Sequence, residues 1–271
     1  MTQAVDNANF EGTEGTVEYL VWRTSDPTFV ALISHGFGEH AMRYQHVAEA
    51  LVGIGAVVYA PDHLGHGKSD GARAVVTDAD HIAVDLHTVA DIARRENRGI
   101  PVVLVGHSMG GLVATRFAQL YRGELSALVL SGPLLGEHPA LALLDMDPIP
   151  EIPVDPETLS RDPKVGEAYM ADPLIYHGPF ARETLEAFKK AMPLVSGGGT
   201  LGEQATFWIH GRDDALVPYD TTAAAMPSLR GPQFQEKTYP GAKHEIFNET
   251  NSDDVIGDVL TFLKDSGLPT S

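Results

Sequence analysis

The residue whose type and setting best suit chemistry in this chain is a serine enclosed by glycines. Residues 106–111 read GHSMGG, with Ser108 in the centre of a G-x-S-x-G pattern. The apolar run 102–105 precedes this pattern and the amphipathic run LVATRFAQLYR follows it. A serine on a sharp turn between a strand and a helix has its hydroxyl exposed as a nucleophile, and flanking glycines leave room for the two elements to approach. This context favours a nucleophilic Ser108 over an ordinary glycine turn with a capping serine.

A serine hydroxyl is a weak nucleophile at neutral pH, so it needs a histidine base and a carboxylate that orients the histidine. The predicted strand 205–210 ends in a turn with two adjacent carboxylates, Asp213 and Asp214. Spacing does not separate the two, and we favour Asp214 because it directly precedes an apolar run. His244 follows the predicted strand 233–239 and a PGAK turn. The chain order serine, aspartate, histidine is the order found on open α/β sheets.

The same chemistry needs two backbone amides that stabilise a developing oxyanion. One is expected from Met109, the residue after the serine. The second is expected from a loop that follows an earlier strand, and FVALIS at residues 29–34 leads into His-Gly-Phe-Gly at residues 35–38. Glycines on both sides of Phe37 allow its amide to turn toward a reacting carbonyl. An ordinary glycine turn remains the alternative for this loop.

Alternating strand and helix patterns along the chain predict an α/β fold with a mostly parallel central sheet and helices on both faces. The expected strands are Val17 to Trp22, Phe29 to Ser34, Val57 to Ala60, Val102 to Val105, Ala127 to Leu130, Thr206 to Ile209 and Gln233 to Thr238. The expected helices are Tyr44 to Val52, Ala79 to Glu96, Leu112 to Tyr121, Thr221 to Met226 and Asp254 to Leu263.

The alternation stops between Leu135 and Gly199, where the chain is rich in proline and closes with three glycines. We expect a single domain over residues 1–271 with a cap, or lid, inserted at residues 134–199. The insertion follows a strand next to the serine strand, so it is placed above the nucleophile and suited to substrate selection. Its apolar clusters at 141–144 and 173–176 either line an acyl tunnel or pack the cap onto the core.

Composition excludes several classes of partner and chemistry. The chain of 271 residues has 19 Lys and Arg against 37 Asp and Glu, a net charge of −18, which opposes binding to nucleic acid or to an anionic membrane. Contact with a lipid surface is therefore expected to be brief and to use an apolar patch of the cap. The chain has no cysteine, which excludes thiol catalysis and disulfides. It shows no apolar transmembrane run and no secretory signal, so we expect a cytoplasmic protein.

Other patterns are weaker. Residues 62–67 read DHLGHG, metal-like residue types that fit a glycine turn better, so we expect no metal. No G-x-G-x-x-G opens a helix and no P-loop is present, so we expect no cofactor. Glu39, His40 and Arg43 follow the glycine loop and either contact a substrate head group or only solvate the next helix.

Five motifs in order, HGFGEHAMRY, APDHLGHGKSDG, GHSMGG, HGRDDALVP and YPGAKHEIFNE, resemble the monoacylglycerol lipase group of the serine α/β-hydrolases, particularly its actinobacterial members. The cap segment LSRDPKVGEAYMADPLIYHG is also similar, so the resemblance covers most of residues 10–263. It implies the α/β-hydrolase fold, with Ser108 as nucleophile, Asp214 as acid and His244 as base. It also implies Phe37 and Met109 as oxyanion donors.

The resemblance implies hydrolysis of monoacylglycerol to glycerol and fatty acid without a cofactor. One position departs from the pattern, because mammalian members have a histidine three residues after the catalytic one and this chain has Phe247. A carboxylesterase or a lysophospholipase remains an alternative, as does a ligand-binding receptor that retains the triad. Dehalogenase or epoxide hydrolase chemistry needs an aspartate nucleophile in place of Ser108. The oligomeric state is not predicted.

Overall fold

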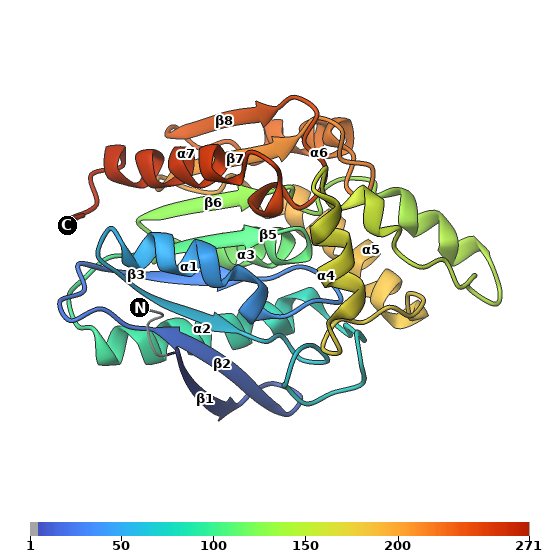
Figure 1. Ribbon diagram of the computed structural model, residues 1–271, viewed down its shortest axis with the longest axis horizontal. Helices are drawn as coiled ribbons and strands as arrows, with labels where there is room; N and C mark the ends of the chain where they lie inside the picture. The colour runs from blue at the N-terminus through green and yellow to red at the C-terminus, as the bar shows by residue number, and fades with distance from the viewer. Residues whose placement is uncertain (1–4, 271) are drawn as a thin grey trace.

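Eight strands form one twisted sheet in a computed structural model that describes residues 5–270 (Figure 1). Residues 1–4 and 271 of the predicted domain lie outside the described part. The strand order is β1-β2-β4-β3-β5-β6-β7-β8; β2 pairs antiparallel with β1 and β4, and the other pairs are parallel. The strands are β1 (Val5–Glu11), β2 (Thr16–Trp22), β3 (Phe29–Ser34), β4 (Ala56–Pro61), β5 (Val102–His107), β6 (Ala127–Ser131), β7 (Ala205–Gly211) and β8 (Phe234–Tyr239). The predicted mostly parallel α/β sheet is confirmed.

Helices cover both faces of the sheet, because the central strands are apolar on both sides. Side chains such as Leu32 and Leu104 pack with α2 and α3 in one core, and side chains such as Ile33 and Val105 pack with α1 and α7 in the other. Figure 1 shows α1 and α7 in front of the sheet and α2 and α3 behind it. The helices outside the insertion are α1 (Gln45–Val52), α2 (Ala79–Glu96), α3 (Met109–Leu120), α6 (Tyr219–Ala225) and α7 (Ser252–Asp265), with 3₁₀ turns η1 (Ala41–Tyr44), η4 (Met226–Ser228) and η5 (Ile246–Asn248).

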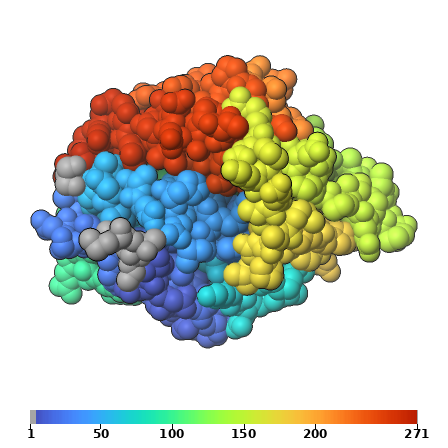
Figure 2. Space-filling model, in the orientation of Figure 1, coloured from blue at the N-terminus to red at the C-terminus, as the bar shows by residue number. Residues whose placement is uncertain are grey.

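Residues 134–199, hereafter the insertion, connect β6 to β7 and lie beyond the carboxyl ends of the parallel strands (Figure 1). In the space-filling view the insertion covers that end of the molecule (Figure 2). It contains η2 (Pro139–Asp145), η3 (Pro156–Thr158), α4 (Pro163–Ala171) and α5 (Arg182–Gly197). The sequence did not predict α4 or α5, since prolines interrupt the helical period there. α4 starts at Pro163 behind a capping Asp162, an arrangement that proline at the first helical position favours.

The carboxyl-terminal half of the insertion is tied to the body of the protein. Arg116 of α3 forms an ion pair with Asp80 of α2 and donates to the carbonyl of Leu194 in α5. Gln119, one turn further along α3, donates to the carbonyl oxygens of Val195 and Gly199. These bonds fix α5 against two core helices.

Candidate active site

Ser108 lies between β5 and α3 with φ of 54° and ψ of −119°, a conformation that is strained for any residue with a Cβ. The two glycines of the motif explain how the chain reaches this turn. A Cβ on Gly110 would lie 2.0 Å from the carbonyl oxygen of Ser34, and one on Gly106 would lie 2.4 Å from the carbonyl oxygen of Gly110. Only glycine therefore allows β5, α3 and β3 to approach this closely.

The structure brings Ser108 together with His244 and Asp214. The Nε2 atom of His244 lies 3.0 Å from the Ser108 hydroxyl oxygen, and its Nδ1 atom lies 2.7 Å from Oδ2 of Asp214. These residues follow the carboxyl ends of three strands, β5, β7 and β8, directly or in the loop after the strand. The arrangement has the geometry of a nucleophile, a base and an orienting acid.

The two adjacent carboxylates that the sequence left open have different surroundings. Asp213 is exposed, whereas Asp214 is buried at 5% exposure and faces His244. The other carboxylate oxygen of Asp214 accepts hydrogen bonds from the amides of Leu216 and Val217, at 3.0 and 2.8 Å. Burial raises the pKa of Asp214, but His244 and His210 outweigh it and hold that pKa well below its usual range. Only Asp214 can orient the imidazole.

His210 is a buried neighbour of Asp214 that the sequence analysis did not single out. The indole N–H of Trp208 donates to Nδ1 of His210 at 3.1 Å, and indole nitrogen is always a donor. Nδ1 is therefore the acceptor, and the N–H of the ring is at Nε2. That N–H donates to the carbonyl of Val217 at 2.9 Å and lies 3.3 Å from Oδ2 of Asp214. The only sequence signal was a histidine at the end of a buried strand.

The amides of Phe37 and Met109 have no acceptor among the residues that the structure describes. Met109 is the first residue of α3, where N–H groups lack partners within the helix. The Phe37 ring stacks on Phe180 of the insertion with centroids 4.7 Å apart, and the carbonyl of Gly38 accepts the amide of Tyr176 at 2.7 Å. The insertion thus holds the loop that presents the Phe37 amide.

Two histidines, His107 and His244, line the cavity with Ser108, and their pKa values separate their roles. Burial lowers the pKa of His107 to about 3, with His244 adding to this effect, so His107 is neutral at any ordinary pH. Burial also acts to lower the pKa of His244, but the negative charge of Asp214 outweighs it and raises that pKa above 6.5.

We expect kcat/KM for ester hydrolysis to fall as the pH drops through the His244 pKa, because a protonated imidazole cannot accept the serine proton. The Asp214→Asn variant should move this acid limb to lower pH, since it removes the charge that raises the pKa. A pH profile with a soluble p-nitrophenyl ester measures both effects. An acid limb that moves in His107→Gln instead would contradict the assignment of His244.

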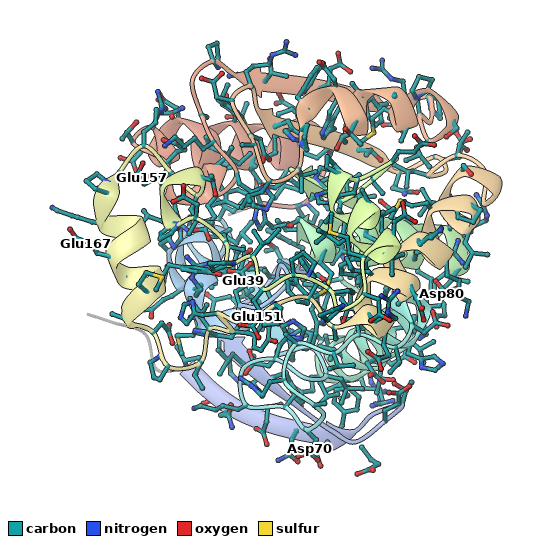
Figure 3. All side chains as sticks on the ribbon, turned by 90° about the vertical axis from the view of Figure 1, so that its right-hand side faces the viewer. Glu39, Asp70, Asp80, Glu151, Glu157 and Glu167 are labelled. Carbon is teal, nitrogen blue, oxygen red and sulfur yellow. The ribbon has the colours of Figure 1, made fainter. Side chains whose placement is uncertain are left out.

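A buried polar group, made up of Glu39, Arg43, Tyr44 and Glu245, lies at one side of the site. Figure 3 shows Glu39 near the middle of the view toward the carboxyl ends of the strands. Glu39 accepts the amide of Gly36 at 2.6 Å and the Tyr44 hydroxyl at 2.5 Å. Arg43 bridges Glu39 and Glu245, at 2.6 and 2.7 Å. Burial raises the pKa of Glu39, but Arg43 outweighs it and lowers it to about 2.

The sequence left two readings open for Glu39, His40 and Arg43. Glu39 and Arg43 line the cavity and are largely buried, so they do not merely solvate the following helix. His40 points elsewhere, to Asp172 of the insertion at 2.9 Å. Glu245 also lines the cavity, and the sequence analysis missed it because a residue beside a candidate base carries no separate signal.

A cavity of about 470 Å³ opens above Ser108 and His244. Most of its lining is apolar and comes largely from the insertion, with Leu141, Leu143, Ile152, Val154, Leu159 and Phe188. Of the two predicted apolar clusters, residues 141–144 contribute to this lining. The cluster 173–176 does not, because Ile175 packs under α4 in a small separate core.

Phe247, the position that departs from the mammalian pattern, does not face the cavity. Its side chain is 2% exposed and packs in the core beneath α1 and α7. Its carbonyl accepts a hydrogen bond from His46 at 2.9 Å.

We expect Phe247→His to lower the free energy of unfolding by about 2–4 kcal/mol, since it replaces a packed ring with a buried polar one. The KM for monoacylglycerol should not fall, because the new side chain would not reach the cavity. Urea denaturation and steady-state kinetics measure the two quantities. A stable variant with a lower KM would show that this position contacts the substrate.

Within residues 5–270, no group of three or more histidine, aspartate or glutamate side chains is arranged to hold a metal ion. No helix in the same range is long and apolar enough to cross a membrane.

Comparison with known proteins places this site in context. The family model described as "Serine aminopeptidase, S33" matches residues 25–251. A monoacylglycerol lipase of Mycolicibacterium smegmatis is 34% identical over 94% of this chain and 95% of its own. The crystal structure of a monoacylglycerol lipase from Paleococcus ferrophilus superposes with a TM-score of 0.77 at 25% identity, covering 97% of this chain and 100% of that one. A carboxyl esterase from Bacillus coagulans in complex with glycerol has a TM-score of 0.83 at 25% identity, over 99% of this chain and 100% of that one.

Proposed function

We propose that this chain, which belongs to the serine aminopeptidase S33 family of α/β-hydrolases, hydrolyses monoacylglycerol to glycerol and a fatty acid. The observation that carries this proposal is a Ser108, His244 and Asp214 triad at the base of a largely apolar cavity with one buried polar side. Such a cavity fits an ester with one long acyl chain and a small polar alcohol.

In this mechanism His244 removes the proton of Ser108 as the hydroxyl oxygen attacks the ester carbonyl. Asp214 holds the imidazole and stabilises its protonated form. The amides of Phe37 and Met109 donate to the oxyanion of the tetrahedral intermediate. The alcohol leaves with the proton from His244, and water then attacks the acyl-enzyme by the same route to release the fatty acid.

The apolar and polar lining residues of the cavity suggest where each part of the substrate binds. The apolar wall from the insertion suits an acyl chain, which gains free energy as its surface leaves water. The carboxylate oxygens of Glu39 and Glu245 can accept hydrogen bonds from the hydroxyl groups of glycerol. With Arg43 between them this group has one net negative charge, which disfavours a phosphate-bearing head group such as that of a lysophospholipid.

The insertion is proposed to act as a cap that selects the substrate and meets a lipid surface briefly. Met146 and Ile152 are 49% and 57% exposed on it, although each is large and apolar. The net charge of −18 opposes lasting attachment to an anionic membrane. We retain a cytoplasmic location as part of the proposal.

Two other functions fit parts of the site. A carboxylesterase for short, soluble esters would use the same triad, and the esterase of similar structure was found in complex with glycerol. A ligand-binding receptor would bind an ester tightly with one slow turnover or none.

Release of acyl groups from purified protein distinguishes these functions. The substrates are 1-monoacylglycerols of increasing chain length, p-nitrophenyl esters, triacylglycerol, a lysophospholipid and an aminoacyl anilide, with Ser108→Ala as the blank. We expect the highest kcat/KM for a monoacylglycerol. Faster turnover of small soluble esters would instead identify a carboxylesterase, and preferred cleavage of the anilide would identify an aminopeptidase. Binding without turnover would identify a receptor.

A further inference from the structure

The loop that carries His244 is paired with part of the insertion far away in sequence. We call residues 243–249 the histidine loop and residues 157–161 the paired segment. Figure 3 shows Glu157, at the start of the paired segment, where the insertion meets the C-terminal part of the chain. Hydrogen bonds to main-chain carbonyls join the two, among them the Glu245 amide to the Leu159 carbonyl at 2.8 Å, the His244 amide to the Thr158 carbonyl at 3.4 Å, and the Ser160 hydroxyl to the Asn248 carbonyl at 3.0 Å.

Glu249 closes the histidine loop and ties it to the paired segment. Its side chain is fully buried and accepts four hydrogen bonds from N–H groups. Two come from the amides of Lys243 and Thr250, at 2.8 and 2.9 Å, which join the ends of the loop. The other two come from the amide and Nε of Arg161, at 3.2 and 2.9 Å. Because Lys243 directly precedes His244, this carboxylate fixes the backbone that carries the base.

The paired segment is anchored in a small apolar core, so it can act as a rigid support. Leu159 is 3% exposed and packs with Tyr169 and Ile175 in the small core beneath α4. Leu216, whose amide donates to Asp214, packs against the same core. Leu159, whose segment supports the base, and Leu216, whose amide supports the acid, therefore pack together in this small core.

We propose that Arg161 and Glu249 are positioning residues whose ion pair holds the histidine loop on the paired segment and so sets the place of His244 relative to Ser108. The insertion is then part of the catalytic framework as well as a cover over the cavity. The reading of Arg161 and Glu249 as parts of the catalytic machinery rests on the proposed function.

The chemistry of Glu249 explains why a neutral replacement matters. A glutamine in its place would have one acceptor oxygen and an NH₂ group, and the NH₂ group would face N–H donors. The histidine loop would lose bonds at one of its ends, and His244 would move relative to Ser108. A displacement of about 1 Å of a catalytic group costs on the order of 100-fold in rate.

The test compares Glu249→Gln, Arg161→Ala and Arg161→Lys with a matched pair, Glu236→Gln and Arg230→Ala. Glu236 lies on β8 and forms an exposed ion pair with Arg230, and neither residue lines the cavity. Steady-state kinetics with a soluble p-nitrophenyl ester give kcat and KM, and thermal unfolding shows which variants are folded. Hydrogen exchange followed by mass spectrometry reports on peptides that contain the paired segment and the histidine loop.

We expect kcat to fall about 10- to 100-fold in Glu249→Gln and Arg161→Ala, with KM changed by less than about threefold. Arg161→Lys should recover part of the loss because it keeps the charge. Exchange should rise in the paired segment and the histidine loop together, and the matched pair should behave like the original chain. If Glu249→Gln does not fold, the two Arg161 variants carry the same test, since Arg161 is partly exposed.

A folded Arg161→Ala or Glu249→Gln with unchanged kcat and unchanged exchange would overturn the inference. So would a variant that exchanges faster throughout the chain, because that result indicates a general loss of stability. Failure of the proposed function looks different: the original chain would then cleave no ester. Exchange of the two paired regions would still show in that case whether Arg161 and Glu249 hold them together.

Discussion

Replacing Ser108 with alanine is expected to lower kcat for ester hydrolysis by about 10⁵- to 10⁶-fold, because the variant has no atom that can form the acyl-enzyme. The change removes one hydroxyl group and leaves the β5 to α3 turn, its glycines and its strained backbone unaltered. The free energy of unfolding should therefore change by less than about 1 kcal/mol. Rates of release from a p-nitrophenyl ester and urea denaturation measure the two quantities.

Ser228→Ala is the matched control, since Ser228 is exposed and its hydroxyl only donates to the carbonyl of Ala225. It should keep full activity. Turnover by Ser108→Ala within about tenfold of the original chain would show that another group attacks the ester. Loss of folding in this variant would leave Asp214→Asn as the decisive test of the triad.

Asp214→Asn is expected to lower kcat by about 10⁴-fold, because an amide cannot hold the histidine tautomer that accepts the serine proton. The side chain keeps its volume, so the nearby amides of Leu216 and Val217 still find a carbonyl oxygen. Asp213→Asn is the neighbouring control and should change kcat less than about threefold, since Asp213 is exposed and does not contact His244.

Steady-state kinetics of both variants on one soluble ester measure the contrast. If Asp213→Asn were the more damaging change, the acid of the triad would be misassigned. Equal and small effects would indicate that His244 acts without a carboxylate partner.

Most of the sheet could be predicted because the signals of its strands are local, and the three residues proposed as the triad have local signals too. Buried parallel strands appear as apolar runs, and Ser108, Asp214 and His244 each follow such a run. The spacing could not separate Asp213 from Asp214, since both occupy the same turn. What distinguishes them is the contact of Asp214 with His244, which lies in a loop 30 residues further along the chain.

Other elements depend on contacts that no local pattern carries. The β1 strand was missed because its burial is only partial and its sequence VDNANFE has few apolar residues. Helices α4 and α5 were missed because proline is tolerated at the start of α4, and because α5 contains Pro193 within an otherwise amphipathic segment. The assignment of residues 134–199 as a cap remains a prediction.

Side chains that act through other side chains were the hardest to find. The tautomer of His210 beside Asp214 depends on Trp208, and the proposed link between the histidine loop and the paired segment depends on Glu249 meeting Arg161 of the insertion. Neither pair has a sequence motif, since the partners meet only in the folded chain. In the sequence such pairs leave only a weak signal, a charged or polar residue near a candidate motif.

Trapping the acyl-enzyme tests the central claim, nucleophilic attack by Ser108, most directly. The protein is mixed with a monoacylglycerol, quenched in acid within the first turnovers, digested and analysed by mass spectrometry. We predict one acyl group on the peptide that contains Ser108, and none on that peptide from Ser108→Ala. An acyl group on another residue, or product release with no covalent intermediate on Ser108 under conditions where a fluorophosphonate labels that residue, would contradict the account.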